Sequence, residues 1–318
     1  MTFIPFSLAE RIASGFLDLL SSRGITPARS SQLEHELLSV TELLEIWKNP
    51  QLAQGSDEAG ILRNAAGVHD FAAKVLSCRN LPEFSQFDEH LKLIAGGTLK
   101  TTISQTVEND PVDDTARKLV ELYVACLALH CGTNVRLDHP TSSKGDNPDV
   151  LLSFEGETWA LAIKTPSSAK KQSLFDNMKS AAKQIERSGA DKGLVVISAK
   201  NIIDHKALWE SSFADLGEAE AALRAELEKV ANEASRDQLQ EEVDSVFAGK
   251  KTVLPVLFIG QSVVLIPTIA SDKTPTPIKM MTACFYDRPG DATGIELAHS
   301  LSLWMQEILL GEPGPPPR

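Results

Sequence analysis

The most constraining feature of the sequence is a pair of short apolar runs joined by the dipeptide Glu155-Gly156. Glycine readily adopts the backbone conformations that tight turns require, so this pattern predicts a β-hairpin. Its strands should span Asp149–Phe154 and Thr158–Thr165. An isolated hairpin is only marginally stable, so other elements of the 318-residue chain must pack against it.

The residues around the hairpin alternate between helical and strand-like patterns. We expect a helix over residues 114–132 that is apolar on nearly every side from Leu119 to Leu129, a polar helix over 174–188 and a continuous apolar strand at 192–198. Further apolar strands are expected in TVLPVLFI, SVVLIPTI and PIKMMTACFYD, followed by a helix from Gly294. Strands interleaved with helices predict an α/β (α+β) domain.

The chain divides into regions of different composition. Residues 1–110 have helical periodicity and no evident chemistry, because His35, His69 and His90 share no metal-ligand spacing. Residues 111–312 contain the strands, and a long acidic helical arm is expected as an insertion at about 205–248. The proline-rich residues 313–318 are expected to be a disordered tail.

Composition excludes several classes of protein. Hydrophobic residues make up 42% of the chain and charged residues 23%, which is typical of soluble globular proteins. No apolar run is long enough to cross a membrane, and we find no secretory signal pattern at the N-terminus. The four cysteines include no CxxC pair, so we expect neither a disulfide framework nor a zinc site, and a cytoplasmic location.

Charge is unevenly distributed along the chain. The net charge of −12 argues against broad, nonspecific binding of nucleic acid. Residues 164–206, however, contain nine Lys and Arg against four acids, whereas residues 208–247 contain eleven acids against three bases. We therefore expect a basic face next to the hairpin, followed by an acidic helical segment.

The segment Ala248–Thr252, with the sequence AGKKT, looks like the end of a phosphate-binding loop. The first glycine of that loop motif is missing, because position 244 is aspartate. We therefore do not predict a nucleotide-binding loop of that kind.

Three ionisable residues lie in apolar surroundings. Glu121 is in the middle of the apolar helix, where a carboxylate needs a cation, hydrogen bonds or a metal to compensate it, unless it faces solvent at the rim. Hairpin pairing should place Asp149 opposite Ala162 or Ile163. Lys164 ends the second strand, where it either leaves into solvent or comes within reach of Asp149.

Taken together, these features resemble the PD-(D/E)XK nuclease superfamily, which has the restriction-endonuclease-like fold. The matching residues are Pro148-Asp149, the hairpin, Ala162-Ile163-Lys164, Glu121 on the preceding helix and Gln184 in AAKQIERSG. The order helix, hairpin, helix, strand also matches over about 114–200, and to about 310 if the later strands extend the sheet. The resemblance implies a mixed sheet flanked by helices, after a helical N-terminal region.

The resemblance also implies an activity and residue roles. Asp149 and Glu121 would bind Mg²⁺ or Mn²⁺, hard cations that favour carboxylate oxygens. Lys164 would orient or activate the attacking water, and Gln184 would contact the site or the substrate. The implied reaction is endonuclease-type hydrolysis of nucleic acid, with DNA as the expected substrate. A restriction or antiphage-defence effector, delivered by a protein partner or as a homo-oligomer, would fit this class.

One position departs from the family pattern. The family has Glu, Asp or sometimes Gln two residues before the lysine, and this chain has Ala162 there. Alanine binds no cation, so cleavage should be slow or absent. Three explanations stay open: an introduced inactivating substitution, a natural pseudonuclease that binds nucleic acid or scaffolds proteins without cutting, or compensation by another acid, either Glu157 or Glu121.

Overall fold

The computed structural model describes residues 6–27, 29–53, 58–95, 114–141, 147–235, 240–248, 250–267, 274–286 and 292–307. The expected boundary at residue 110 and the tail at 313–318 lie outside these ranges. No helix within them is both long enough and apolar enough to span a membrane.

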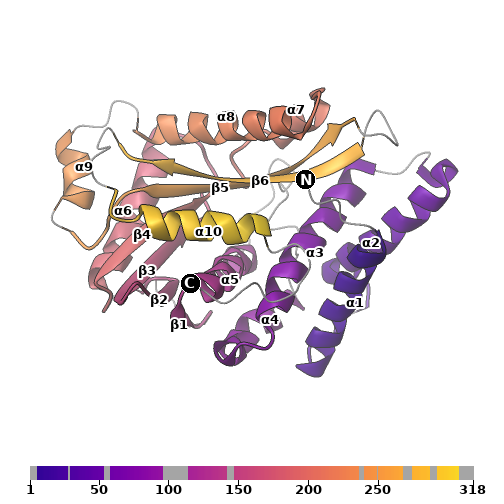
Figure 1. The fold of residues 1–318 in the computed structure, drawn as a ribbon, viewed down its shortest axis with the longest axis horizontal. Helices are drawn as coiled ribbons and strands as arrows, with labels where there is room; N and C mark the ends of the chain where they lie inside the picture. The colour runs from indigo at the N-terminus through magenta and orange to yellow at the C-terminus, as the bar shows by residue number, and fades with distance from the viewer. Residues whose placement is uncertain are drawn as a thin grey trace.

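A six-stranded mixed sheet forms the centre of the molecule, with the strands in sequence order (Figure 1). Its strands are β1 (Thr133–Leu137), β2 (Val150–Phe154), β3 (Glu157–Lys164), β4 (Lys192–Ser198), β5 (Val256–Ile266) and β6 (Thr274–Cys284). The β3–β4 and β4–β5 pairs are parallel and the others are antiparallel. The predicted α/β class with a sheet flanked by helices is confirmed.

Helices cover both faces of the sheet. One face packs against α5 (Asp114–Cys131), α10 (Ile295–Glu307) and the N-terminal helix α3 (Glu58–Cys78), and the other against α6 (Lys171–Arg187), α8 (Leu216–Ser235) and their neighbours (Figure 1). Both faces of the sheet are apolar and need covering. Strand β3 is an example, because its alternate side chains point to opposite faces. Trp159, Leu161 and Ile163 join the first apolar cluster, and Ala160 and Ala162 join the second.

The predicted hairpin is confirmed, with strand bounds that differ by one residue. Phe154 pairs with Glu157 and Val150 with Leu161. Both turn residues have positive φ, 51° at Glu155 and 81° at Gly156, as a type I′ turn requires. This register places Asp149 next to Ala162, at the end of the hairpin away from the turn.

The prediction of two strands between residues 252 and 269 was wrong, because β5 is one strand that runs through Gly260 and Gln261. Gly260 does not interrupt the strand. It leaves room for α8, because a Cβ at this position would lie 2.7 Å from Cδ2 of Leu227 on that helix. The buried side chain of Gln261 bonds to Tyr123 on α5 at 2.8 Å. Strand β1, at the edge of the sheet, was not predicted.

The expected acidic arm is three helices, α7 (His205–Glu210), α8 and α9 (Gln240–Phe247). Helix α8 lies along β5 and β6 instead of projecting from the fold (Figure 1). Its apolar residues Leu223, Leu227 and Val230 recur at helical spacing and are buried against the sheet. The acidic residues that suggested an arm are the solvent face of a packed helix.

The N-terminal region is helical, as expected, and contains α1 (Phe6–Ser22), α2 (Gln32–Lys48), α3 (Glu58–Cys78) and α4 (Asp88–Ile94), with short 3₁₀ segments at Pro50–Ala53 and Pro82–Phe87. Its core residues share one continuous apolar cluster with α5 and the sheet. A buried polar network strengthens this contact: Asp70 of α3 accepts hydrogen bonds from Tyr123 at 2.7 Å, Lys279 at 2.5 Å and Lys74 at 3.2 Å.

Candidate active site

The candidate site lies where β2 begins and β3 ends. Asp149 directly precedes β2 and Lys164 is the last residue of β3. Glu121 comes from α5 on one face of the sheet, and Gln184 comes from α6 on the other. The fold therefore brings these four residues, from both faces of the sheet, to the same end of β2 and β3.

Asp149 is held rigidly against β3. Its Oδ2 accepts the backbone N–H of Ile163 at 2.6 Å, and its own N–H donates to the carbonyl of Leu161 at 3.1 Å. The side chain is buried, with 5% exposure, and burial raises its pKa, while the charge of Lys164 opposes the rise. The carboxylate of Asp149 is thus held in place by a hydrogen bond, and the charge of Lys164 offsets the effect of its burial only in part.

Glu121 is buried rather than at a solvent-facing rim. Its Oε2 accepts a hydrogen bond from Nζ of Lys118, one turn earlier on α5, at 2.8 Å. Burial raises the pKa of Glu121 to about 8, and the negative charge of Asp149 is the second cause of the rise. The two carboxylates therefore interact, and each makes ionisation of the other less favourable.

The side chain of Lys164 does not extend freely into solvent. Its Nζ donates to Oε1 of Gln184 at 2.5 Å, and Nε2 of Gln184 donates to the backbone carbonyl of Asn147 at 2.7 Å. Burial lowers the pKa of Lys164, and the charges of Asp149 and Glu121 oppose that shift. Gln184 fixes the ammonium beside the segment that carries Asp149.

The structure thus brings four predicted residues together: charge interactions link Glu121, Asp149 and Lys164, and a hydrogen bond joins Gln184 to Lys164. Ala162 lies on the α6 side of β3, fully buried in the second apolar cluster. Its methyl group packs in the core, so a carboxylate at this position would have to displace apolar contacts to reach the group.

Compensation by Glu157 is ruled out by position. Glu157 is the first residue of β3 and pairs with Lys192 at 2.7 Å. Lys164 lies seven positions further along β3, which corresponds to about 23 Å along the strand. It therefore cannot supply the missing ligand.

Two neighbours of the site were missed by sequence reasoning. Lys118 could have been found, because it lies three residues before Glu121 on the same helix face. Asp138 could not, because its role depends on strand β1: its backbone N–H donates to the carbonyl of Asp149 at 2.9 Å. Its charge adds to the rise in the pKa of Asp149, and its buried Oδ2 accepts no hydrogen bond from the described residues.

The donor atoms suit a hard divalent cation in kind but are few in number. Two buried carboxylates that oppose each other's ionisation would both be stabilised in the charged form by a cation, and Mg²⁺ commonly keeps several waters as its other ligands. Within the described ranges, however, no three His, Cys, Asp or Glu side chains form a group that could hold a metal. Glu121 and Asp149 could hold such an ion only with water or substrate oxygens completing its shell.

Comparisons with protein-family models, with curated proteins and with solved structures found no match for this chain.

Proposed function

We propose that the chain is a metal-dependent, endonuclease-type phosphodiesterase with a restriction-endonuclease-like fold, and that Ala162 weakens its cleavage of nucleic acid. The observation that supports the proposal is that two buried carboxylates, Glu121 and Asp149, interact electrostatically with the partly buried Lys164 at one end of a hairpin, where Gln184 holds the lysine by a hydrogen bond. Buried ionisable groups with opposed pKa shifts are typical of functional sites. DNA is the proposed substrate, and a cytoplasmic defence role is part of the same proposal.

The residues have distinct roles in this proposal. Glu121 and Asp149 would hold Mg²⁺ or Mn²⁺, which would offset the charge of the scissile phosphate and lower the pKa of a bound water. Lys164 would stabilise negative charge on the phosphate, since its ammonium is fixed by Gln184 and lies in a region of low dielectric. Gln184 is a positioning residue for Lys164.

A second candidate function is supported by the ion pair of Lys118 with Glu121. In this reading the chain is a non-catalytic pseudonuclease that binds nucleic acid or scaffolds a protein complex. Lys118 provides a positive charge at 2.8 Å from Glu121, so the buried carboxylate is satisfied without a metal. The apolar packing of Ala162 is consistent with the same reading.

Cleavage and binding assays on one set of variants separate the two candidates. The full chain, Asp149→Asn and Lys164→Ala would be incubated with labelled single- and double-stranded DNA and RNA in Mg²⁺ or Mn²⁺. A nuclease should cleave at least one substrate, and either substitution should slow cleavage about 100-fold. Binding that needs Lys164 without any cleavage would establish the second candidate. Absence of both cleavage and binding would refute the proposed function.

A further inference from the structure

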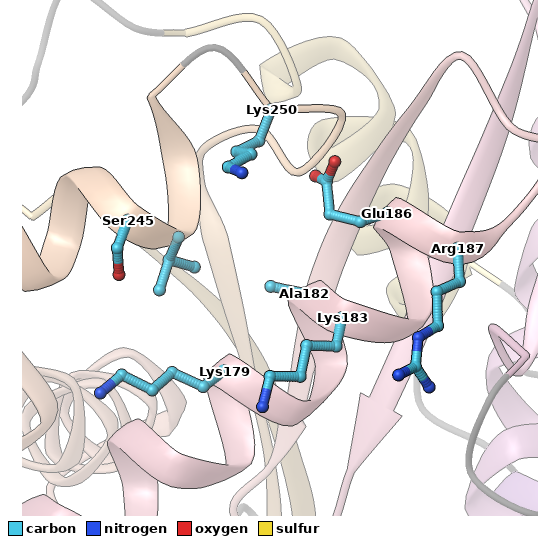
Figure 2. A pocket seen from close by; sticks show the side chains of 8 residues that line it. Lys179, Ala182, Lys183, Glu186, Arg187, Ser245 and Lys250 are labelled. Atoms are coloured by element: carbon cyan, nitrogen blue, oxygen red, sulfur yellow. The ribbon is translucent and has the colours of Figure 1, made fainter.

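A basic pocket lies between α6 and α9, and the candidate active site does not use its lining residues. Its volume is about 360 Å³. Four cationic side chains line it: Lys179, Lys183 and Arg187 from α6, and Lys250 from the segment before β5. The three α6 residues lie four positions apart, so they share one side of the helix. Figure 2 shows Lys250 on the other side of the pocket, with the charged ends of Lys179, Lys183 and Arg187 pointing away from it.

The described residues that line the pocket include more cationic than acidic side chains. Glu186 is the one carboxylate among the described residues that line the pocket, and four cations against it leave an excess of three charges. Its Oε1 already accepts the backbone N–H of Thr252 at 2.9 Å and the Thr252 hydroxyl at 3.1 Å. At the rim, Nζ of Lys179 is 4.0 Å from Glu242, a separation too long for a hydrogen bond.

The segment that carries Lys250 is anchored to its surroundings. Lys251 donates to the carbonyl of Ser188 at 2.7 Å, and its own carbonyl accepts the N–H of Gly193 at 2.9 Å. Together with the bonds from Thr252 to Glu186, these contacts fix the segment at the C-terminal end of α6. The AGKKT motif thus supplies a lysine to the pocket, although it forms no phosphate-binding loop of the kind that precedes a helix.

The shape and composition of the pocket indicate a compact ligand. A volume of about 360 Å³ falls in the range of small-molecule sites. Buried Ala182 and Val246 give the lining an apolar part, beside the exposed Ser245. Glu241 and Glu242 on α9 would repel a long polyanion that extended beyond the pocket over that helix.

We propose that this pocket binds a small phosphate-bearing ligand of the size of a nucleoside monophosphate. The long side chains of the lysines and Arg187 would turn toward the phosphate and hold it by charge-assisted hydrogen bonds. The less polar part of the ligand would contact Ala182 and Val246. This site differs from the proposed nuclease site in residues and in chemistry, because it requires no metal ion.

Calorimetric titration of the full chain tests this site in a phosphate-free, low-salt buffer that contains EDTA. The probes are AMP, pyrophosphate, inorganic phosphate and adenosine. We expect one saturable site for AMP, no binding of adenosine, and weaker binding of AMP as NaCl is raised. Lys183→Ala and Lys250→Ala should each weaken AMP binding about tenfold, Lys250→Glu should abolish it, and Lys250→Arg should retain it.

Two variants serve as controls. Lys206→Ala removes an exposed lysine of α7 that pairs with Glu210 outside the pocket, so it should bind AMP as the wild type does. Asp149→Asn should also leave AMP binding unchanged, which separates this site from the candidate active site. The proposal is overturned if no phosphate-bearing probe saturates, if adenosine binds as AMP does, or if either control weakens binding as much as Lys250→Ala. It is equally overturned if only an oligonucleotide binds and AMP cannot displace it.

Discussion

Lys118 lies 2.8 Å from Glu121 across one turn of α5, and this pair places two side chains of opposite charge beside the buried carboxylate of Asp149. The pair explains how the fold tolerates Glu121 within an apolar helix. It also means that a divalent cation at Glu121 would have to compete with Lys118. Because the same carboxylate is central to both candidate functions, its protonation is the first property to test.

Glu121→Gln should reduce the dependence of stability on pH. The folded-state pKa of Glu121 is raised to about 8 from 4.5, so between these values the folded protein holds a proton that the unfolded chain has lost. Stability from this group is therefore full below about pH 4.5 and declines as pH rises to about 8. Urea unfolding at pH 5 and pH 8 should show a smaller decline in the free energy of unfolding for Glu121→Gln than for the wild type. An equal decline in both proteins would contradict the raised pKa, and Glu157→Gln is the control.

Ala162→Glu should destabilise the metal-free protein, because the new carboxylate enters an apolar cluster that is fully buried in the wild type. We expect a loss of about 3 kcal/mol in the free energy of unfolding. If a cation binds at Glu121 and Asp149, Mg²⁺ or Mn²⁺ should recover more stability in this variant than in the wild type, and cleavage should appear or increase. Thermal unfolding with and without the metal measures the first effect. Equal metal responses in the two proteins would argue against the proposed nuclease site.

Gln184→Leu should release Lys164 from its fixed position. The substitution removes the acceptor of Lys164 and the donor to the carbonyl of Asn147, so two partly buried hydrogen bonds are lost. A loss of about 2 kcal/mol in the free energy of unfolding is expected. Gln184→Glu retains an acceptor for Lys164 and should restore part of that stability. Urea unfolding of the three proteins gives the comparison, and a Gln184→Leu variant as stable as the wild type would refute the positioning role.

Gly260→Ala should strain the packing of α8 against β5. The added Cβ would lie 2.7 Å from Cδ2 of Leu227, well inside a normal carbon–carbon contact. Overpacking of this kind lowers stability by about 1–3 kcal/mol. The double variant Gly260→Ala, Leu227→Ala should be more stable than the sum of the two single effects predicts, because the space for the methyl group is then available. Strict additivity in a double-mutant cycle would disprove the close contact.

Asp70→Asn should be the most destabilising of these substitutions. It removes the negative charge that faces Lys74 and Lys279, and Lys74 is fully buried. Loss of one partner from a buried ion pair lowers stability by about 3–5 kcal/mol. Chemical unfolding measures the change, with the exposed Asp176→Asn as the control. A change below about 1 kcal/mol would mean that neighbouring groups, not Asp70, neutralise the two lysines.

Local sequence patterns predicted the parts of the fold that local physics determines. The hairpin followed from Glu155-Gly156. For Glu121 the sequence left two positions open, a buried one and a solvent-facing one at the rim of the helix, and the structure has the buried one. The continuity of β5 could not be predicted, because Gly260 is explained by Leu227, a residue distant in the chain. Asp138 was missed for the same reason, since only the pairing of β1 with β2 brings it beside Asp149.

The network around Asp70 has a practical consequence for dissecting the chain. A fragment starting near residue 114 would keep Tyr123 and Lys279 but lose the carboxylate that both contact in the intact protein. It would also uncover the apolar surface of α5 that α3 and α4 cover. Biochemists who wish to isolate the sheet-bearing half should therefore expect an aggregating product, and should assay activities on the intact polypeptide.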